Sequence, residues 1–193
     1  GTVDIKDTTK EELSRMMVGR DVQLQVEKKP ANPGKAVLDV KNVTMHNSQS
    51  KKDSVKNVSF QVHGGEIVCL AGIEGNGQTE FVYGLTGLEP LVSGELFLCG
   101  QDITHTSIRK RSTMGMSHIP EDRHKHGLVL DYTLADNMVL QRYWQPEFQK
   151  GGFIQKEKVR EYSDKLIAQY DVRSGQGSST IVRSMSGGNQ QKA

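Results

Sequence analysis

The residues with the clearest chemical meaning form a glycine-rich loop that leads into a predicted helix. Gly72, Gly75 and Gly77 follow the apolar run 67–71, which suits a buried strand, and Thr79 opens the helix. Glycines allow successive backbone N–H groups to point inward, and a helix N-terminus adds partial positive charge. A strand, a glycine loop and a helix in this order predict a cradle for phosphate.

One position departs from the usual phosphate-loop pattern, because Gln78 stands where that pattern has lysine. A charge-assisted hydrogen bond contributes about 1.5–3 kcal/mol, whereas a neutral one contributes about 0.5–1.5 kcal/mol. We therefore expect roughly tenfold weaker nucleotide binding and a larger loss of hydrolysis, because charge develops on the phosphates in the transition state. A turn without a ligand is the alternative interpretation. A dinucleotide-binding loop fits less well, because its third glycine is missing.

A second candidate anion site lies near the end of the sequence, where Ser186 is followed by Gly187 and Gly188. Ser186 can cap the helix that is predicted to start there. A serine and two glycines at a helix N-terminus are typical of a place where backbone N–H groups meet an anion.

The composition is that of one ordinary domain of 193 residues, with 25 Lys plus Arg, 23 Asp plus Glu and a net charge of +2. This balance lacks the basic excess of a nucleic-acid-binding surface. The 35% hydrophobic content is low for a self-sufficient core, no apolar run is long enough to cross a membrane, and no signal peptide opens the sequence. Cys69 and Cys99 lie in apolar runs, so we expect buried, reduced thiols and a reducing compartment, the cytosol.

The remaining pattern predicts the elements that position these residues. Alternating apolar and polar residues indicate strands, whereas capping residues and a 3.6-residue period indicate helices. Several short strands around one glycine loop suggest a mixed parallel and antiparallel sheet. We expect a helix capped by Thr9 that stops at Gly19, a linker over 21–34, strands over 37–43, 55–62, 94–100 and 114–119, a turn over 46–53, a helix from Thr133 to about Gln141, and an amphipathic helix over 156–170.

The segment 186–192 reads Ser-Gly-Gly-Asn-Gln-Gln-Lys and resembles the signature motif of ABC-transporter ATPases. It begins 109 residues after Gly77 (186 minus 77), a plausible separation for these domains. Together the two motifs resemble the second nucleotide-binding half of the tandem ATPases that serve sugar and nucleoside importers. Segments 71–78, 118–123 and 127–130 are most similar to the nucleoside-import branch.

The resemblance implies an α/β fold of the P-loop NTPase class, an ABC-type ATPase domain with an incomplete central sheet, an antiparallel β subdomain and a helical subdomain. Residues 1–34 would be the end of a preceding half and a linker, 35–120 the ABC β-core with the phosphate loop, and 121–193 the helical subdomain ending at the signature motif. The family's magnesium aspartate, the glutamate beside it and the switch histidine would follow residue 193. We therefore expect a piece of a longer protein, with no catalytic residue and no ATPase activity of its own.

The resemblance also implies roles for individual residues. Thr79 would approach Mg²⁺, and Glu121 would occupy the Q-loop position that senses the membrane subunit, where the family usually has glutamine. Met185 replaces the usual leucine of the signature, and the region of His46 and Asn47 lacks the aromatic residue that usually stacks on adenine. The phosphate-loop candidates are Gly72, Glu74, Gly75, Asn76, Gly77, Gln78, Thr79 and Glu80, and the signature candidates, which would contact ATP held by the opposite half, are Ser186, Gly187, Gly188, Asn189 and Gln190.

The function implied by the resemblance is that of the ATP-binding component of an ABC importer for nucleosides or simple sugars, with ATP and Mg²⁺ as cofactors. Expected partners are the first nucleotide-binding half of the same polypeptide, membrane permease subunits and, indirectly, a solute-binding protein; no nucleic acid is expected. The protein would lie peripherally on the cytoplasmic face of the cell membrane. The degenerate phosphate loop would leave the intact-looking signature to complete the partner half's site. Alternatives are a soluble ABC-type ATPase of DNA repair or translation, and a non-catalytic scaffold half.

Overall fold

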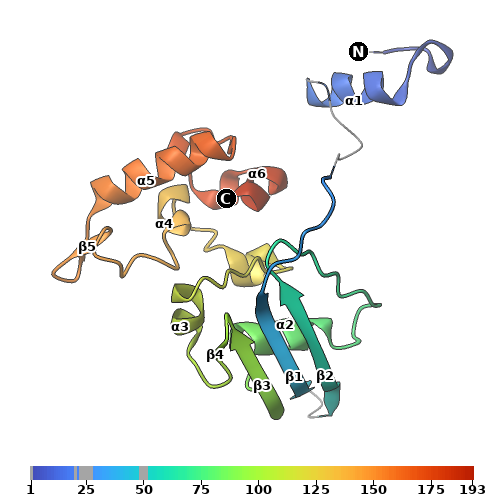
Figure 1. Ribbon diagram of the computed structural model, residues 1–193. Helices are drawn as coiled ribbons and strands as arrows, with labels where there is room; N and C mark the ends of the chain where they lie inside the picture. Colours follow the sequence, from blue (N-terminus) through green and yellow to red (C-terminus); the bar gives the residue numbers. More distant parts are fainter. Residues whose placement is uncertain (1, 20, 22–27, 48–51) are drawn as a thin grey trace.

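The computed structural model describes residues 2–19, 21, 28–47 and 52–193. Within these residues, no helix combines the length and the apolar character needed to cross a membrane. Figure 1 shows a sheet with one helix against it and a separate group of short helices. In chain order the elements are η1 (Ile5–Asp7), α1 (Lys10–Val18), β1 (Ala36–His46), β2 (Asp53–His63), α2 (Gln78–Thr86), β3 (Ser93–Leu98), β4 (Gln101–Asp102), α3 (Ile108–Thr113), the π-helix η2 (Arg123–Gly127), α4 (Leu134–Met138), β5 (Gln149–Lys150), β6 (Phe153–Ile154), α5 (Lys156–Gln169), η3 (Gly177–Ser179), η4 (Val182–Ser184) and α6 (Gly187–Lys192).

Strands β1 to β4 form one antiparallel sheet in the order β2-β1-β3-β4, and α2 packs against it (Figure 1). Alternation along each strand turns every second side chain toward one face. The buried core joins Val40, Met45 and Leu96 of the sheet to Phe81 of α2. The three predicted strands that correspond to β1, β2 and β3 are therefore confirmed, with β1 and β2 longer than expected.

The expected mixed sheet and its buried strand are not found. Every pairing in the four-stranded sheet is antiparallel, and the apolar run 67–71 belongs to no strand. Ile67 is 85% exposed and Leu70 is 52% exposed. A strand of a parallel sheet is buried only when neighbours pair with its backbone and helices cover both faces. No strand among the described residues pairs with this run, so the prediction of a buried strand is wrong.

A predicted strand over 114–119 and the predicted burial of the two cysteines are also not found. Met114 ends α3, and residues 115–119 have no regular structure, with Ile119 83% exposed. The strand predicted there is wrong, because apolar residues alone do not supply the paired backbone that a strand needs. The thiols of Cys69 and Cys99 are free, as expected, but both residues are exposed rather than buried. Cys99 lies in the turn between β3 and β4 with φ +49°.

The later part of the chain folds as short helices around two small clusters of buried residues. One cluster contains Leu134, Val172, Val182 and Met185, and the other contains Val139, Phe148 and Val159. The amphipathic helix is confirmed as α5, whereas α4 ends earlier than predicted. The boundary at residue 121 between two subdomains stays a prediction.

The helix near the start of the chain is confirmed as α1. The Thr9 hydroxyl accepts a hydrogen bond from the Glu12 backbone N–H at 3.2 Å, and Gly19 ends the helix with φ +78°. Both features match the capping signals in the sequence. Residues 22–27 of the predicted linker and residues 48–51 of the predicted turn lie outside the described residues.

Arg111 of α3 joins the end of α2 to the chain that follows β4. Arg111 is 3% exposed, and its Nη1 donates to the carbonyls of Gly84 and Leu85, each at 2.7 Å. Its Nη2 donates to the Thr104 carbonyl at 3.1 Å, and its Nε donates to the Thr106 carbonyl at 3.3 Å. The C-terminal end of a helix carries partial negative charge, which favours a cation there. Burial lowers the pKa of the Arg111 guanidinium from its ordinary value.

We expect Arg111→Ala to lower the free energy of unfolding by about 2–4 kcal/mol, because it leaves buried carbonyls at the end of α2 without a donor. Urea unfolding followed by far-ultraviolet circular dichroism measures this change. Lys110→Ala removes an exposed cation from the same helix and should change the free energy by less than about 0.5 kcal/mol. Equal losses for the two variants would contradict the role of Arg111.

Candidate functional site

The phosphate-loop candidates lie where the chain enters α2. Gly75 has φ +88° and Gly77 has φ +97°, in the left-handed region that favours glycine. Gly77 also has no room for a side chain, because a Cβ there would lie 2.5 Å from the Ser54 carbonyl oxygen. Gly77 is the N-cap of α2, so the loop ends at the start of that helix. The loop thus approaches β2 closely and turns directly into the helix.

The Gln78 side chain folds back across this loop. Its Nε2 donates to the Ile73 carbonyl at 3.3 Å. A Cβ on Gly72 would lie 1.9 Å from the same nitrogen, so the glycine leaves the space that the carboxamide fills. The residue in the lysine position therefore makes a neutral bond within the loop. A phosphate that entered here would compete with the Ile73 carbonyl for this amide.

The side chains beside the loop differ in whether they bond to neighbouring residues. Thr79 is exposed at the start of α2. The Glu80 carboxylate accepts a hydrogen bond from the Asn47 side-chain amide. His46, at the end of β1, pairs with Asp53 through its Nδ1 at 2.8 Å. Neither side chain of the predicted adenine region therefore stands free of its neighbours.

Glu121 lies exposed just before the π-helix η2. The Asp122 carboxylate caps η2 by accepting hydrogen bonds from the backbone N–H groups of His124 at 2.9 Å and Lys125 at 3.1 Å. The Lys125 N–H bond lowers the pKa of Asp122, and the His124 N–H and the nearby His124 and His126 rings lower it further. The residues after the Q-loop position are thus held by a charged cap.

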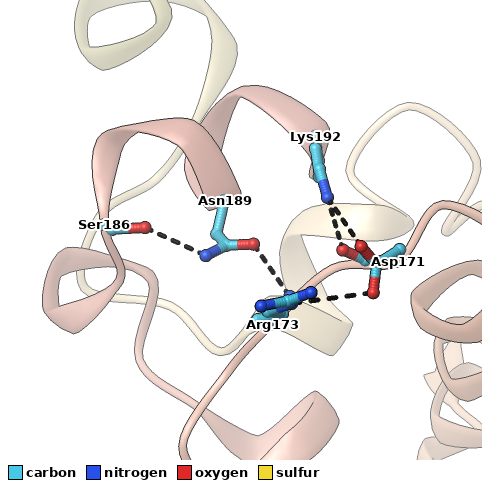
Figure 2. A network of polar contacts seen from close by, with 5 residues as sticks. All are labelled: Asp171, Arg173, Ser186, Asn189 and Lys192. Carbon is cyan, nitrogen blue, oxygen red and sulfur yellow. Dashed lines mark hydrogen bonds and ion pairs between the residues drawn. The ribbon is translucent and has the colours of Figure 1, made fainter. Parts of the chain in front are cut away.

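The signature candidates begin α6, and Ser186 occupies the N-cap position with its side chain exposed. The Ser186 hydroxyl makes no bond to the helix backbone, so the expected side-chain cap is wrong. Instead, the Asn189 Nδ2 donates to the Ser186 Oγ at 2.9 Å, and the Asn189 Oδ1 accepts from the Arg173 backbone N–H at 2.8 Å (Figure 2). Asn189 thus joins the N-cap of α6 to the segment that follows α5.

Side chains of η2, which follows Glu121, contact side chains of α6. Gln190 is 7% exposed, and its Nε2 donates to the Val182 carbonyl at 3.0 Å. Its Oε1 therefore faces the His124 Nε2, 2.8 Å away, and this nitrogen must carry a hydrogen. Arg123 Nη1 donates to the Gln191 Oε1 at 3.3 Å. Sequence reasoning missed Arg123 and His124, because nothing in the local pattern indicates contacts with residues so far along the chain.

A second set of contacts ties the other end of α6 to the turn that follows α5. The Lys192 Nζ donates to the Asp171 carbonyl at 2.7 Å and to its Oδ2 at 3.2 Å (Figure 2). Asp171 has φ +49°, which is uncommon outside glycine but tolerated by aspartate. The Arg173 Nε lies 3.8 Å from the Asp171 Oδ1. The turn that follows α5 is therefore bonded to α6 both near its start, through Asn189, and at its end, through Lys192.

The predicted site residues form two separate groups. No hydrogen bond or ion pair between described residues joins the phosphate-loop candidates to the signature candidates. Figure 1 shows α2 with the sheet and α6 among the helices. A cavity of about 700 Å³ opens beside α6, with His118, Arg123, Gln190 and Gln191 in its wall, but it includes neither Glu121 nor Ser186. Of the residues chosen from the sequence, the cavity therefore contains only Gln190.

We expect the cap of η2 to be lost in acid. Because the folded state lowers the pKa of Asp122, its contribution to stability is complete above about pH 4, the ordinary aspartate value, and disappears as the pH falls through the folded-state pKa. The backbone N–H signals of His124 and Lys125, followed by NMR as pH falls, should move with a midpoint below about 3.9.

Asp122→Asn should abolish this acid transition, whereas Asp164→Asn, on the exposed face of α5, should leave it unchanged. A midpoint at or above the ordinary aspartate value, or a transition that survives in Asp122→Asn, would show that Asp122 does not hold η2.

Comparison with known proteins identifies the family. A family model described as "ABC transporter" matches residues 55–193. The chain is 44% identical over 192 residues to the nucleoside import ATP-binding protein NupA of Lactococcus lactis, covering 100% of this chain and 38% of that protein. It is 41% identical over 192 residues to the guanosine import ATP-binding protein NupO of Bacillus subtilis, covering 100% of this chain and 37% of that protein. The chain thus spans less than two fifths of the length of these curated relatives.

Solved structures agree on the fold. The ATP-binding cassette MJ0796, as a dimer bound to ADP and phosphate in a post-hydrolysis state, superimposes with a TM-score of 0.62 at 17% identity, covering 80% of this chain and 66% of that chain. A nucleotide-free ATP-binding cassette from an ABC transporter gives a TM-score of 0.60 at 16% identity, covering 81% of this chain and 61% of that chain. The predicted α/β fold of the ABC type is confirmed. The chain belongs to the ABC transporter family.

Proposed function

We propose that this chain is part of the ATP-binding component of an importer for nucleosides or simple sugars, which couples ATP binding and hydrolysis to uptake. The observation that carries the proposal is the exposed Ser186-Gly187-Gly188 turn on an ABC-type fold. Two relatives that match the whole chain are named as import ATP-binding proteins for nucleosides and guanosine, which favours the nucleoside branch.

The two candidate groups have unequal roles in this proposal. The phosphate loop carries Gln78, a neutral amide that is already bonded to the Ile73 carbonyl, so it is the weaker ATP site. The Ser186-Gly187-Gly188 turn of the signature is exposed, Asn189 bonds to the Ser186 hydroxyl, and the buried Gln190 bonds to the Val182 carbonyl. We therefore assign to this chain the task of completing the ATP site of a partner half, which makes a largely non-catalytic, site-completing role the best description of this half.

The residues of the phosphate loop fit the phosphates of ATP, though weakly. Gly75 and Gly77 provide the turn, and the backbone N–H groups at the start of α2 supply partial positive charge. Thr79 is the residue that would meet Mg²⁺ with its exposed hydroxyl. The described residues contain no group of three or more His, Cys, Asp or Glu that could hold a metal. Bound Mg²⁺ would neutralise phosphate charge, with Thr79 as the residue of this loop that would help to hold it.

The same proposal includes a division of the chain into subdomains and a set of partners. Residues 1–34 would end a first nucleotide-binding half and link it to this one, 35–120 would form the β-core, and 121–193 would form the helical subdomain. Glu121, exposed before η2, would contact a membrane permease subunit, and a solute-binding protein would act through that permease. This proposed arrangement would put the protein on the cytoplasmic face of the membrane as a peripheral subunit. The separate cores of the sheet and of the helices support the division into two subdomains.

Variants in the two motifs should differ strongly in ATP turnover, measured on the assembled transport ATPase that contains this chain. A side chain at Gly188 meets no atom within 4 Å, so Gly188→Asp should preserve the fold while placing a carboxylate where ATP phosphate approaches. We expect it to lower steady-state ATP turnover at least about 100-fold. Gln78→Ala should lower turnover by less than about tenfold, because it removes only a neutral hydrogen bond. Normal turnover in Gly188→Asp, with an unchanged melting temperature, would contradict the proposed function.

The weakness of the phosphate loop can be measured on this chain by titration with Mg-ATP, followed residue by residue by NMR. Gln78→Lys should tighten binding roughly tenfold, because a charge-assisted hydrogen bond replaces a neutral one. The signals that move should belong to residues 72–80. Gln101→Lys adds the same charge to the exposed strand β4 and should leave the affinity unchanged. Equal gains in both variants would mean that net charge, not the loop, determines binding.

A further inference from the structure

We propose that Asn189 is a positioning residue, which holds the Ser186 hydroxyl so that it donates a hydrogen bond outward to the terminal phosphate of a nucleoside triphosphate. This inference rests on the proposed function, since it concerns the same signature turn. It assigns to Asn189 a task that differs from direct contact with the nucleotide. Figure 2 shows the side chains that carry the argument.

The orientation of the Asn189 amide follows from its partners. The Arg173 backbone N–H can only donate, so the atom that faces it at 2.8 Å must be the amide oxygen. The amide NH₂ then faces the Ser186 Oγ at 2.9 Å. Asn189 therefore donates to the serine, and the serine oxygen is the acceptor of that bond.

This direction determines what the serine can still do. A hydroxyl has one hydrogen to donate, and a bond that its oxygen accepts leaves that hydrogen unused. Within the part of the chain that the structure describes, the Ser186 hydroxyl makes no cap bond to α6, and the residue is exposed. Phosphate oxygens at neutral pH are mostly acceptors, so they match a donor that faces solvent.

The amide is held by a turn that is itself fixed. Arg173 follows Val172, which is 5% exposed and packs in one cluster with Met185, directly before the signature. On the other side of Val172, the Asp171 carbonyl and carboxylate both accept from Lys192 of α6. Because α6 anchors the turn and the turn anchors Asn189, the Asn189 amide keeps one side of the Ser186 oxygen occupied and turns the hydroxyl hydrogen away from itself before any ligand binds.

Two substitutions separate positioning from simple structural support. Asn189→Asp retains an oxygen for the Arg173 N–H but turns the other atom into an acceptor, which draws the Ser186 hydrogen inward. Asn189→Ala loses the Arg173 bond as well and leaves the hydroxyl free to rotate. We expect Asn189→Asp to lower kcat/KM for ATP about 10–100-fold in the assembled ATPase and Asn189→Ala about 3–10-fold. A purely structural role predicts the reverse order, and that order would overturn the inference.

A double-mutant cycle provides the second test. If Asn189 acts through Ser186, then Asn189→Ala should have little further effect in a Ser186→Ala background, less than about twofold. Additive losses would overturn the inference, whereas normal kcat/KM in Ser186→Ala alone would overturn the proposed function and this inference with it. Asn137→Ala is the matched control, because the Asn137 side chain, in α4, also accepts a backbone bond and donates others: its Oδ1 accepts from the Val129 N–H, and its Nδ2 donates to the Val129 and Thr133 carbonyls. It should lower the melting temperature but change kcat/KM less than about twofold.

NMR of this chain tests the geometry without an assay of turnover. The Arg173 backbone N–H should keep its protection from hydrogen exchange in Asn189→Asp and lose it in Asn189→Ala, because only the aspartate retains an acceptor. Loss of protection in both variants would mean that no side-chain oxygen at position 189 accepts from the Arg173 N–H. That result would overturn the proposed orientation of the Asn189 amide, and with it the bond from Asn189 to Ser186.

Discussion

The buried guanidinium of Arg111 is the interaction on which the arrangement of the sheet and α2 depends. A buried cation costs free energy unless its hydrogens are paired, and here four carbonyls accept them. Two of these carbonyls belong to the last turn of α2, whose first turn receives the phosphate loop. The loop is therefore anchored indirectly, through a helix that is held at its far end. No carboxylate is needed, because the helix terminus itself supplies the negative charge.

Locally determined features could be predicted from the sequence. The cap at Thr9 with the stop at Gly19, the alternation of β1 and the apolar face of α5 each depend on a few neighbouring residues. Burial could not be predicted in the same way, because it depends on distant partners. The run 67–71 is apolar enough for a buried strand, yet no described strand pairs with it. The expected burial of Cys69 failed with that strand.

The candidate site shows the same division. The left-handed backbone at Gly75 and Gly77 could be predicted, because glycine adopts that conformation more readily than other residues. The contact between Arg123 and Gln191 was not, since 68 residues separate them. The Arg123 Nε is buried without a hydrogen-bond partner among the described residues, although Nη1 of the same guanidinium donates to the Gln191 Oε1. Side chains of η2 and α6 thus share one polar junction that is not completely satisfied, whereas the phosphate-loop candidates lead into α2, which packs on the sheet.

The exposed apolar run also bears on how this chain behaves at high concentration. Residues 67–73 contain no charged side chain, and the nearest charges are the carboxylates of Glu66 and Glu74 on either side. An uncharged, β-prone stretch that no neighbouring strand pairs with is a template for intermolecular pairing, and flanking charges oppose such pairing. The His63 backbone N–H lowers the pKa of Glu66, so this carboxylate keeps its charge further into the acid range. Glu66 and Glu74 therefore flank the exposed run on both sides as charged gatekeepers against strand-to-strand association, and the lowered pKa of Glu66 extends its protection further into the acid range.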